Sequence, residues 1–154
     1  YLTFRKVRPP LRSEADRAAM AEGVASGVID VIVSSHEPQG ADTKRQPFAS
    51  AAAGTVGLET LLAAALSLSQ DGQAGLSHVL KALTASPARI FGLPTGTLSK
   101  GAPADLVLFD EDAPFQVRAE ALHSRARNTA FEGRTFSGMV QQTFVGGARV
   151  FARG

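Results

Sequence analysis

The chain has 154 residues, of which 44% are hydrophobic and 19% are charged, and its formal net charge is +2. This length suffices for one domain with a buried core, and no apolar run approaches the roughly 18 residues of a membrane span. The absence of cysteine excludes disulfides and thiolate metal sites, while a single tyrosine, no tryptophan and scattered basic residues argue against nucleic-acid binding.

The beginning of the chain is predicted to follow a strand–helix–strand order. Residues 1–7 have the composition of a strand that enters a proline turn. Ser13 is a suitable N-cap for a helix that ends near Gly27. The β-branched residues 28–33 then predict a buried parallel strand, so we expect a parallel sheet with a helical crossover.

Residues 34–53 are expected to form a long loop at the C-terminal end of that strand. The segment contains two prolines and shows no regular apolar period. In α/β barrels the loops at this end of the strands build the active-site face, and a loop of this length inside a domain is usually functional. This loop is therefore the first place to expect a site.

The remainder of the chain is predicted to form helices followed by a small β region. Apolar periodicity predicts helices, and β-branched or aromatic runs with a Gly146-Gly147 turn predict strands and a hairpin. The predicted secondary structure changes from helices to strands after Pro94, so we expect one unit over residues 1–94 and another over residues 95–154. The expected helices cover residues 57–70, 76–85 and 87–92, and the expected strands cover residues 104–110, 140–145 and 148–151.

His36 and Glu37 are the candidate chemical groups of the long loop. At a strand end they could ligate a metal, act as a general base or bind substrate, or His36 could simply bond to the backbone. The chain has three histidines and no His-x-His pair, so we expect no complete zinc site within it. Residues 54–57 could cradle an anion at the next helix, although a tight helix entry is the simpler interpretation.

Several segments in order resemble the dihydroorotase family of amidohydrolases. Residues 6–12 (KVRPPLR) and 29–38 (IDVIVSSHEP) resemble two of its motifs, and the combination of PPLR with GLET favours dihydroorotase over hydantoinase or allantoinase. Further matching positions are Lys44 and residues 47–48, 57–60, 86–92, 101–107, 128–133 and 138–150. The last of these segments are similar to the wider amidohydrolase ending, where a barrel helix precedes a small β domain.

This resemblance implies an α/β fold, namely the C-terminal part of a (β/α)8 TIM-type barrel over residues 1–94, followed by part of a small β-sandwich domain over residues 95–154. It also implies a zinc hydrolase of pyrimidine biosynthesis that interconverts dihydroorotate and N-carbamoyl-L-aspartate, with zinc activating a hydroxide. The chain lacks an initiator methionine and is expected to be a C-terminal fragment. We expect it to be inactive and to hold no zinc alone, because the family's His-x-His ligands belong to the N-terminal part.

Three positions depart from the family pattern. The family's catalytic Asp aligns with Ser35, its substrate-binding His with Gln39 and its substrate-binding Asn with Arg8. A hydroxyl without a base cannot replace a carboxylate in proton transfer, and Glu37 is the nearest carboxylate. The expected site has Ser35 and Glu37 as catalytic residues, no metal ligand, and four substrate-binding residues, Arg8, Arg12, His36 and Gln39.

Two other interpretations remain open for the parent protein. The Ser35 change favours a non-catalytic dihydroorotase-like subunit that partners aspartate carbamoyltransferase, and a hydantoinase-like cyclic amidase is the third hypothesis. We expect a small-molecule substrate, a homo-oligomer, a cytoplasmic location and no nucleic-acid or membrane partner. Two barrel units cannot close a barrel, so the isolated chain should self-associate.

Overall fold

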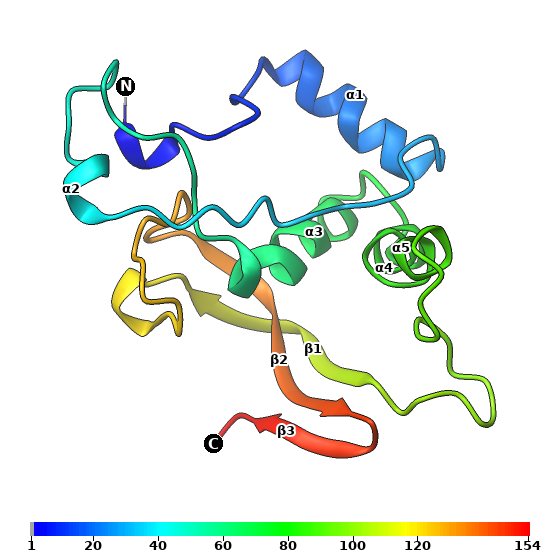
Figure 1. Cartoon of the computed structure of the whole chain (residues 1–154). Helices are drawn as coiled ribbons and strands as arrows, with labels where there is room; N and C mark the ends of the chain where they lie inside the picture. Colours follow the sequence, from blue (N-terminus) through cyan, green and yellow to red (C-terminus); the bar gives the residue numbers. More distant parts are fainter. Residues whose placement is uncertain (1) are drawn as a thin grey trace.

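The computed structural model describes residues 2–154, with a helical region beside a small antiparallel sheet (Figure 1). Helix α3 lies between α1 and the sheet, while α4 and α5 lie together at one side. The helices are α1 (Glu14–Ala25), α2 (Ala41–Lys44), α3 (Leu61–Gln70), α4 (Leu76–Leu83) and α5 (Ala85–Ile90), and the strands are β1 (Leu106–Gln116), β2 (Thr135–Val145) and β3 (Ala148–Ala152). No helix within residues 2–154 is long and apolar enough to cross a bilayer.

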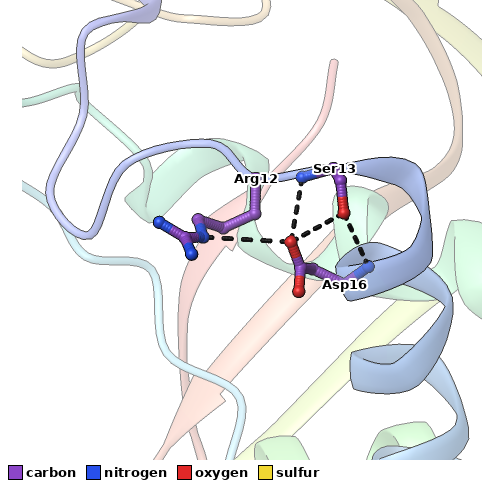
Figure 2. Close-up of polar contacts among 3 residues, drawn as sticks. All are labelled: Arg12, Ser13 and Asp16. Carbon is purple, nitrogen blue, oxygen red and sulfur yellow. Dashed lines mark hydrogen bonds and ion pairs between the residues drawn. The ribbon is translucent and has the colours of Figure 1, made fainter.

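Helix α1 begins after Ser13, the predicted N-cap, and the structure adds a capping box at this end. The Ser13 hydroxyl accepts a hydrogen bond from the backbone N–H of Asp16 at 3.2 Å, and the Asp16 carboxylate accepts from the Ser13 N–H at 3.1 Å (Figure 2). This reciprocal pair satisfies two of the backbone donors that every helix N-terminus leaves free. Gly27 follows the helix with φ of 76°, which confirms the expected stop.

The strand expected over residues 1–7 is wrong. Thr3–Arg5 form a short 3-10 helix, in which the Arg5 N–H donates to the Leu2 carbonyl and the Lys6 N–H donates to the Thr3 carbonyl, both at 3.0 Å. Tyr1 lies outside the described residues. Because all strands within residues 2–154 belong to the β1–β2–β3 sheet, this segment has no strand to pair with, and local bonds satisfy its backbone instead.

The buried parallel strand expected over residues 28–33 is also wrong. The segment is extended between α1 and α3 (Figure 1), but it forms no ladder, and Val28 and Val33 are 80% and 68% exposed. Ile29 and Ile32 instead pack against the core formed by α1, α3 and α4. A strand requires a neighbour for its backbone bonds, and among the described residues the one parallel pairing nearby is the single bridge between His36 and Thr55.

The three predicted helices after residue 57 are confirmed. A 3-10 turn, Leu58–Thr60, leads into α3, and α4 and α5 follow. Val79 of α4 is fully buried and packs with Ala65 of α3 and Val24 of α1, which makes the α1–α3–α4 core. His78 is exposed, as its position off the apolar stripe predicts.

The predicted β region is confirmed as a three-stranded antiparallel sheet in the order β1–β2–β3. Gly146 and Gly147 form the turn of the β2–β3 hairpin, with φ of 55° and 82°. Two-residue hairpin turns of type I′ have positive φ at both central residues, which glycine adopts readily. Strand β1 runs to Gln116, beyond the expected end, because an irregularity between Asp110 and Pro114 lets pairing with β2 resume.

A second core joins the sheet to the helical region. Ala63 of α3 packs with Val117 and with Phe136 of β2, and Phe131 meets the Phe136 ring edge-on at 5.2 Å between centroids. Helix α3 therefore contributes to both cores, with Ala65 in the first and Ala63 in the second. It thereby joins the sheet to the helical region.

Candidate functional site

The loop that follows residues 28–33 is attached to the segment preceding α3 by backbone bonds. The Glu37 N–H donates to the Thr55 carbonyl at 2.7 Å, and His36 and Thr55 form the parallel bridge. Ser35, just before this bridge, has φ of 45°, a conformation that is uncommon outside glycine and that turns the chain sharply. The loop then continues through the short helix α2.

The imidazole of His36 is held by two backbone amides. Its Nδ1 accepts hydrogen bonds from the N–H groups of Gly57 at 3.1 Å and Leu58 at 3.4 Å. Because Nδ1 is an acceptor, the neutral ring carries its proton on Nε2, and that N–H is the group left to act on a ligand.

Asn128, from the segment between β1 and β2, reaches into the same loop. Its Oδ1 accepts from the Gln39 N–H at 3.1 Å, and its Nδ2 donates to the carbonyls of Glu37 at 3.2 Å and Gly54 at 3.3 Å. Only 2% of Asn128 is exposed. A buried amide satisfied on both ends fixes the backbone that it contacts.

Lys44, the last residue of α2, is completely buried beside Asn128. Its ammonium group donates to the carbonyls of Lys6 at 3.2 Å, Ala52 at 3.0 Å and Gly54 at 3.0 Å. Burial lowers the pKa of Lys44, the nearby charge of Lys6 lowers it further, and Glu37 opposes the shift.

Gly54 is required where the Lys44 and Asn128 side chains converge. Its φ is +125°, and a Cβ built there would lie 2.7 Å from the Glu37 carbonyl oxygen and 2.9 Å from the Glu37 Cγ. Both the backbone conformation and the close approach exclude a larger residue.

A cavity of about 1220 Å³ opens beside this loop, between the start of the chain, α2 and the segment that contains Asn128. His36 and Gln39 line it, together with a set of charged side chains that is mostly basic. The charged lining residues are Arg5, Lys44, Arg45, Arg125, Arg127 and Glu132. The Lys44 ammonium is bonded to three carbonyls, and Arg127 donates to the carbonyls of Ala119 and Leu122. The guanidinium groups of Arg5, Arg45 and Arg125 are therefore the ones that suit an anionic ligand, because guanidinium binds carboxylates with paired hydrogen bonds.

Of the six predicted site residues, four lie close together because they are neighbours in the sequence, and only His36 and Gln39 line the cavity. The four neighbours are Ser35, His36, Glu37 and Gln39 of the loop. Arg8 is exposed and follows Lys6, whose carbonyl is bonded to Lys44 and to the Gly54 N–H.

The sixth predicted residue, Arg12, lies at the start of α1. Its Nε is 3.9 Å from the Asp16 carboxylate, and both side chains are largely exposed (Figure 2). Neither Arg8 nor Arg12 is among the residues that line the cavity.

The sequence alone predicts no role for Lys44 or Asn128. Both lie in segments that resemble the family, but a lysine between polar residues has the composition of a surface position. Only their burial and their distant carbonyl partners identify them. Within residues 2–154 no three histidine, aspartate or glutamate side chains gather closely enough to hold a metal ion.

Comparison with known proteins identifies the family. Residues 7–150 match the amidohydrolase family. The dihydroorotase of Anaeromyxobacter sp. (strain K) is 44% identical over 154 residues, which is 100% of this chain and 36% of that protein. The dihydroorotase of Wolbachia sp. subsp. Drosophila simulans (strain wRi) is 41% identical over 148 residues, covering 96% of this chain and 34% of that protein.

Solved structures show the same arrangement of elements. L-Hydantoinase (dihydropyrimidinase) from Arthrobacter aurescens superimposes with a TM-score of 0.86 at 30% identity, over 97% of this chain and 34% of that protein. A D-hydantoinase superimposes with a TM-score of 0.89 at 23% identity, over 98% of this chain and 34% of that protein, and shows the fold alone. The chain spans about a third of the length of these relatives. The chain therefore belongs to the amidohydrolase family, and its resemblance to the dihydroorotases of that family is confirmed.

Proposed function

We propose that the protein containing this chain is a dihydroorotase-like cyclic amidohydrolase, which interconverts dihydroorotate and N-carbamoyl-L-aspartate. The observation that carries the proposal is the identity of 44% to a dihydroorotase without loss of coverage anywhere along the chain. In this proposal residues 1–94 complete a (β/α)8 barrel and residues 95–154 complete a β-sandwich, with the rest of both supplied by the remaining two thirds of the protein. A barrel would also give residues 28–33 the neighbouring strands that they lack.

Zinc is the metal that the family resemblance implies, but the residues described here do not form a site for it. No cluster of three potential ligands exists among residues 2–154, and the Nδ1 of His36 is already occupied by two amide donors. In this proposal the ligands of the metal belong to the remainder of the protein.

The residues of the loop have distinct proposed roles in substrate binding. The Nε2–H of His36 donates to a substrate oxygen, and the amide of Gln39 binds beside it. The guanidinium groups of Arg5, Arg45 and Arg125 hold the substrate carboxylate, because a charge-assisted hydrogen bond is about twice as strong as a neutral one. Arg8 and Arg12 are proposed to approach the substrate from the edge of the site.

Ser35 and Glu37 are the proposed catalytic positions. Glu37 is the nearest carboxylate to the position where the family has its Asp. Its backbone N–H donates to the Thr55 carbonyl, and its carbonyl accepts from the side-chain amide of Asn128. Proton transfer through Glu37 would need its side chain to reach the substrate amide within hydrogen-bond distance.

Zinc content and dihydroorotate hydrolysis of the full-length protein, with Glu37→Gln beside it, test the proposal. We expect bound zinc and turnover in the wild type, and a loss of turnover without loss of zinc in Glu37→Gln. A wild type that contains zinc but does not hydrolyse dihydroorotate would contradict the proposed enzymatic function and would support the non-catalytic subunit.

The alternative is a non-catalytic dihydroorotase-like subunit that partners aspartate carbamoyltransferase, and Ser35 in place of the family Asp favours it. Ser35→Asp separates the two, because aspartate is enriched among non-glycine residues at positive φ and fits this backbone. Turnover gained by Ser35→Asp in an inert wild type, together with co-purification of the transcarbamoylase, supports the subunit. An active wild type that does not bind the transcarbamoylase rejects it.

A hydantoinase-like amidase is the other candidate, and the 30% identity to an L-hydantoinase structure supports it. Parallel assays with dihydroorotate, hydantoins and dihydrouracil discriminate, since one ring should be hydrolysed far faster than the others. A cytoplasmic location and a homo-oligomeric state belong to the same proposal. Size-exclusion chromatography with light scattering on the full-length protein measures the second.

A further inference from the structure

Asn128 connects the C-terminal region of the chain to the candidate site through three side-chain hydrogen bonds. Its main-chain carbonyl also accepts from the Val56 N–H at 3.3 Å, a contact that does not depend on the side chain. The three partners of the side chain, Gln39, Glu37 and Gly54, are 89, 91 and 74 residues away in the sequence. All three side-chain contacts are to main-chain atoms, so they position the backbone of the loop whichever side chains it carries. Asn128 itself is 2% exposed, its bond to Gly54 is buried, and its bonds to Gln39 and Glu37 are partly buried. In such surroundings water does not easily replace these bonds.

The Gly54 carbonyl joins this contact to a second one. It accepts from Nδ2 of Asn128 at 3.3 Å and from Nζ of Lys44 at 3.0 Å. Lys44 also binds the carbonyls of Lys6 and Ala52. We call Lys44, Gly54 and Asn128 the buried polar centre, because together they hold the start of the chain, the loop and the C-terminal region to one another.

The geometry of His36 depends on this centre. The Gly54 N–H donates to the Lys6 carbonyl, and Thr55, the next residue, pairs with the His36–Glu37 backbone. Gly57, whose N–H donates to Nδ1 of His36, lies three positions after Gly54. Moving Gly54 would therefore move both the backbone and the ring contacts of His36.

We propose that Asn128 is a positioning residue for the candidate site: it fixes the main chain of Glu37, Gln39 and Gly54 so that His36 and Gln39 are presented to the cavity. This inference rests on the proposed function for its effect on catalysis, but its structural part stands on the contacts alone. An amide is required at this position, because neither an apolar nor an acidic side chain can both accept from one N–H and donate to two carbonyls.

The test uses the full-length protein with Asn128→Leu, which nearly keeps the volume and removes all three bonds. Gln70→Leu is the matched control, because the Gln70 amide also donates to a distant main-chain carbonyl, that of Glu111 at 3.0 Å, but away from the cavity. Hydrogen exchange is measured at the amides of Gln39 and of Val79, which is bonded within the helical core. Steady-state kcat and KM are measured in parallel.

In Asn128→Leu we expect exchange at Gln39 to accelerate at least tenfold while Val79 stays within twofold of wild type. We expect kcat to fall at least tenfold, with a smaller change in KM. Gln70→Leu should leave both amides and kcat within twofold. Equal acceleration at Gln39 and Val79, or no acceleration at Gln39, would overturn the inference, since the first indicates general destabilisation and the second shows that Asn128 does not hold the loop.

Asn128→Asp keeps the inference testable if Asn128→Leu does not fold. Its carboxylate still accepts from the Gln39 N–H but cannot donate to Glu37 or Gly54, so exchange at Gln39 should stay within threefold while kcat falls. An unchanged kcat in this variant overturns the catalytic role. If the wild type itself lacks turnover, the proposed function fails, whereas hydrogen exchange at Gln39 still decides whether Asn128 positions the loop.

Discussion

Lys44 carries its charge at a position where the side chain is fully withdrawn from solvent. Three carbonyl oxygens take the place of water around the ammonium group, yet burial and the charge of Lys6 still lower its pKa. A lysine whose folded pKa lies below its unfolded pKa binds more protons when unfolded, within the pH window between the two values. Its contribution to stability must therefore rise with pH across that window.

The variant Lys44→Met tests this sign. We expect the difference in free energy of unfolding between wild type and Lys44→Met to shift in favour of wild type as pH rises toward the ordinary lysine pKa. Urea denaturation at a series of pH values measures it. Lys81→Met, at an exposed residue of α4, is the control and should show no such slope. A difference that is flat or falls with pH would contradict the burial argument.

Ser13 makes a second residue-scale prediction, at the N-terminus of α1. The Ser13 hydroxyl donates to the Asp16 carboxylate at 2.7 Å and the Ser13 N–H donates to it at 3.1 Å, and these two bonds lower the pKa of Asp16. The same hydroxyl accepts from the Asp16 N–H, which is the cap bond. Ser13→Ala should destabilise the fold by about 1 kcal/mol, the usual cost of losing a cap. Ser77→Ala, at an exposed serine of α4, should stay within about 0.5 kcal/mol in the same thermal denaturation series.

At the scale of elements, the contact of α3 with β2 depends on a glycine. A Cβ on Gly138 would lie 2.5 Å from Cδ1 of Leu66, which is almost fully buried, and the φ of Gly138 is +104°. The helix can approach the sheet this closely only because the strand has no side chain at that point.

Gly138→Ala should therefore destabilise the protein by about 1–3 kcal/mol through overpacking, in addition to the strain of its positive φ. Gly133→Ala is the matched control, because its φ is +75° but nothing lies within 4 Å of the added Cβ. Chemical denaturation of both variants measures the packing contribution as their difference. Equal losses would mean that backbone strain alone accounts for the effect at Gly138.

At the scale of the whole molecule, the described chain exposes many large apolar side chains. Val28 and Val33 face solvent on a segment with no strand beside it, and Leu98, Phe91 and Leu11 are exposed elsewhere. A surface with apolar groups next to unpaired backbone is a template for association.

We therefore predict that the 154-residue chain of 16.0 kDa self-associates, and sedimentation velocity over a concentration series measures this. Replacing Val28 and Val33 together by lysine should shift the distribution toward the monomer. Ser77→Lys is the control, because Ser77 is an exposed residue of α4 and its replacement adds a lysine without removing an exposed apolar side chain. A concentration-independent monomer with a cooperative melting transition would refute the prediction.

Elements whose hydrogen bonds are local could be predicted from the order of residues. Ser13, Asp16 and Gly27 mark the ends of α1, and Gly146 with Gly147 marks the hairpin, because these bonds join residues only a few positions apart. The family and the position of the candidate loop also followed from the sequence, since the matching segments keep their order along the whole chain.

Features that depend on partners from other segments could not be predicted before the fold was known. Residues 28–33 have strand composition but no strand, because ladder bonds must come from a neighbour that composition cannot supply. Asn128 and Lys44 look like ordinary polar residues until the fold brings their side chains to the Gly54 carbonyl. Asn128 bonds to main-chain groups 74 to 91 residues away, and Lys44 bonds to carbonyls 8 to 38 residues away. Both matter because they are buried, where an unpaired polar atom would be costly.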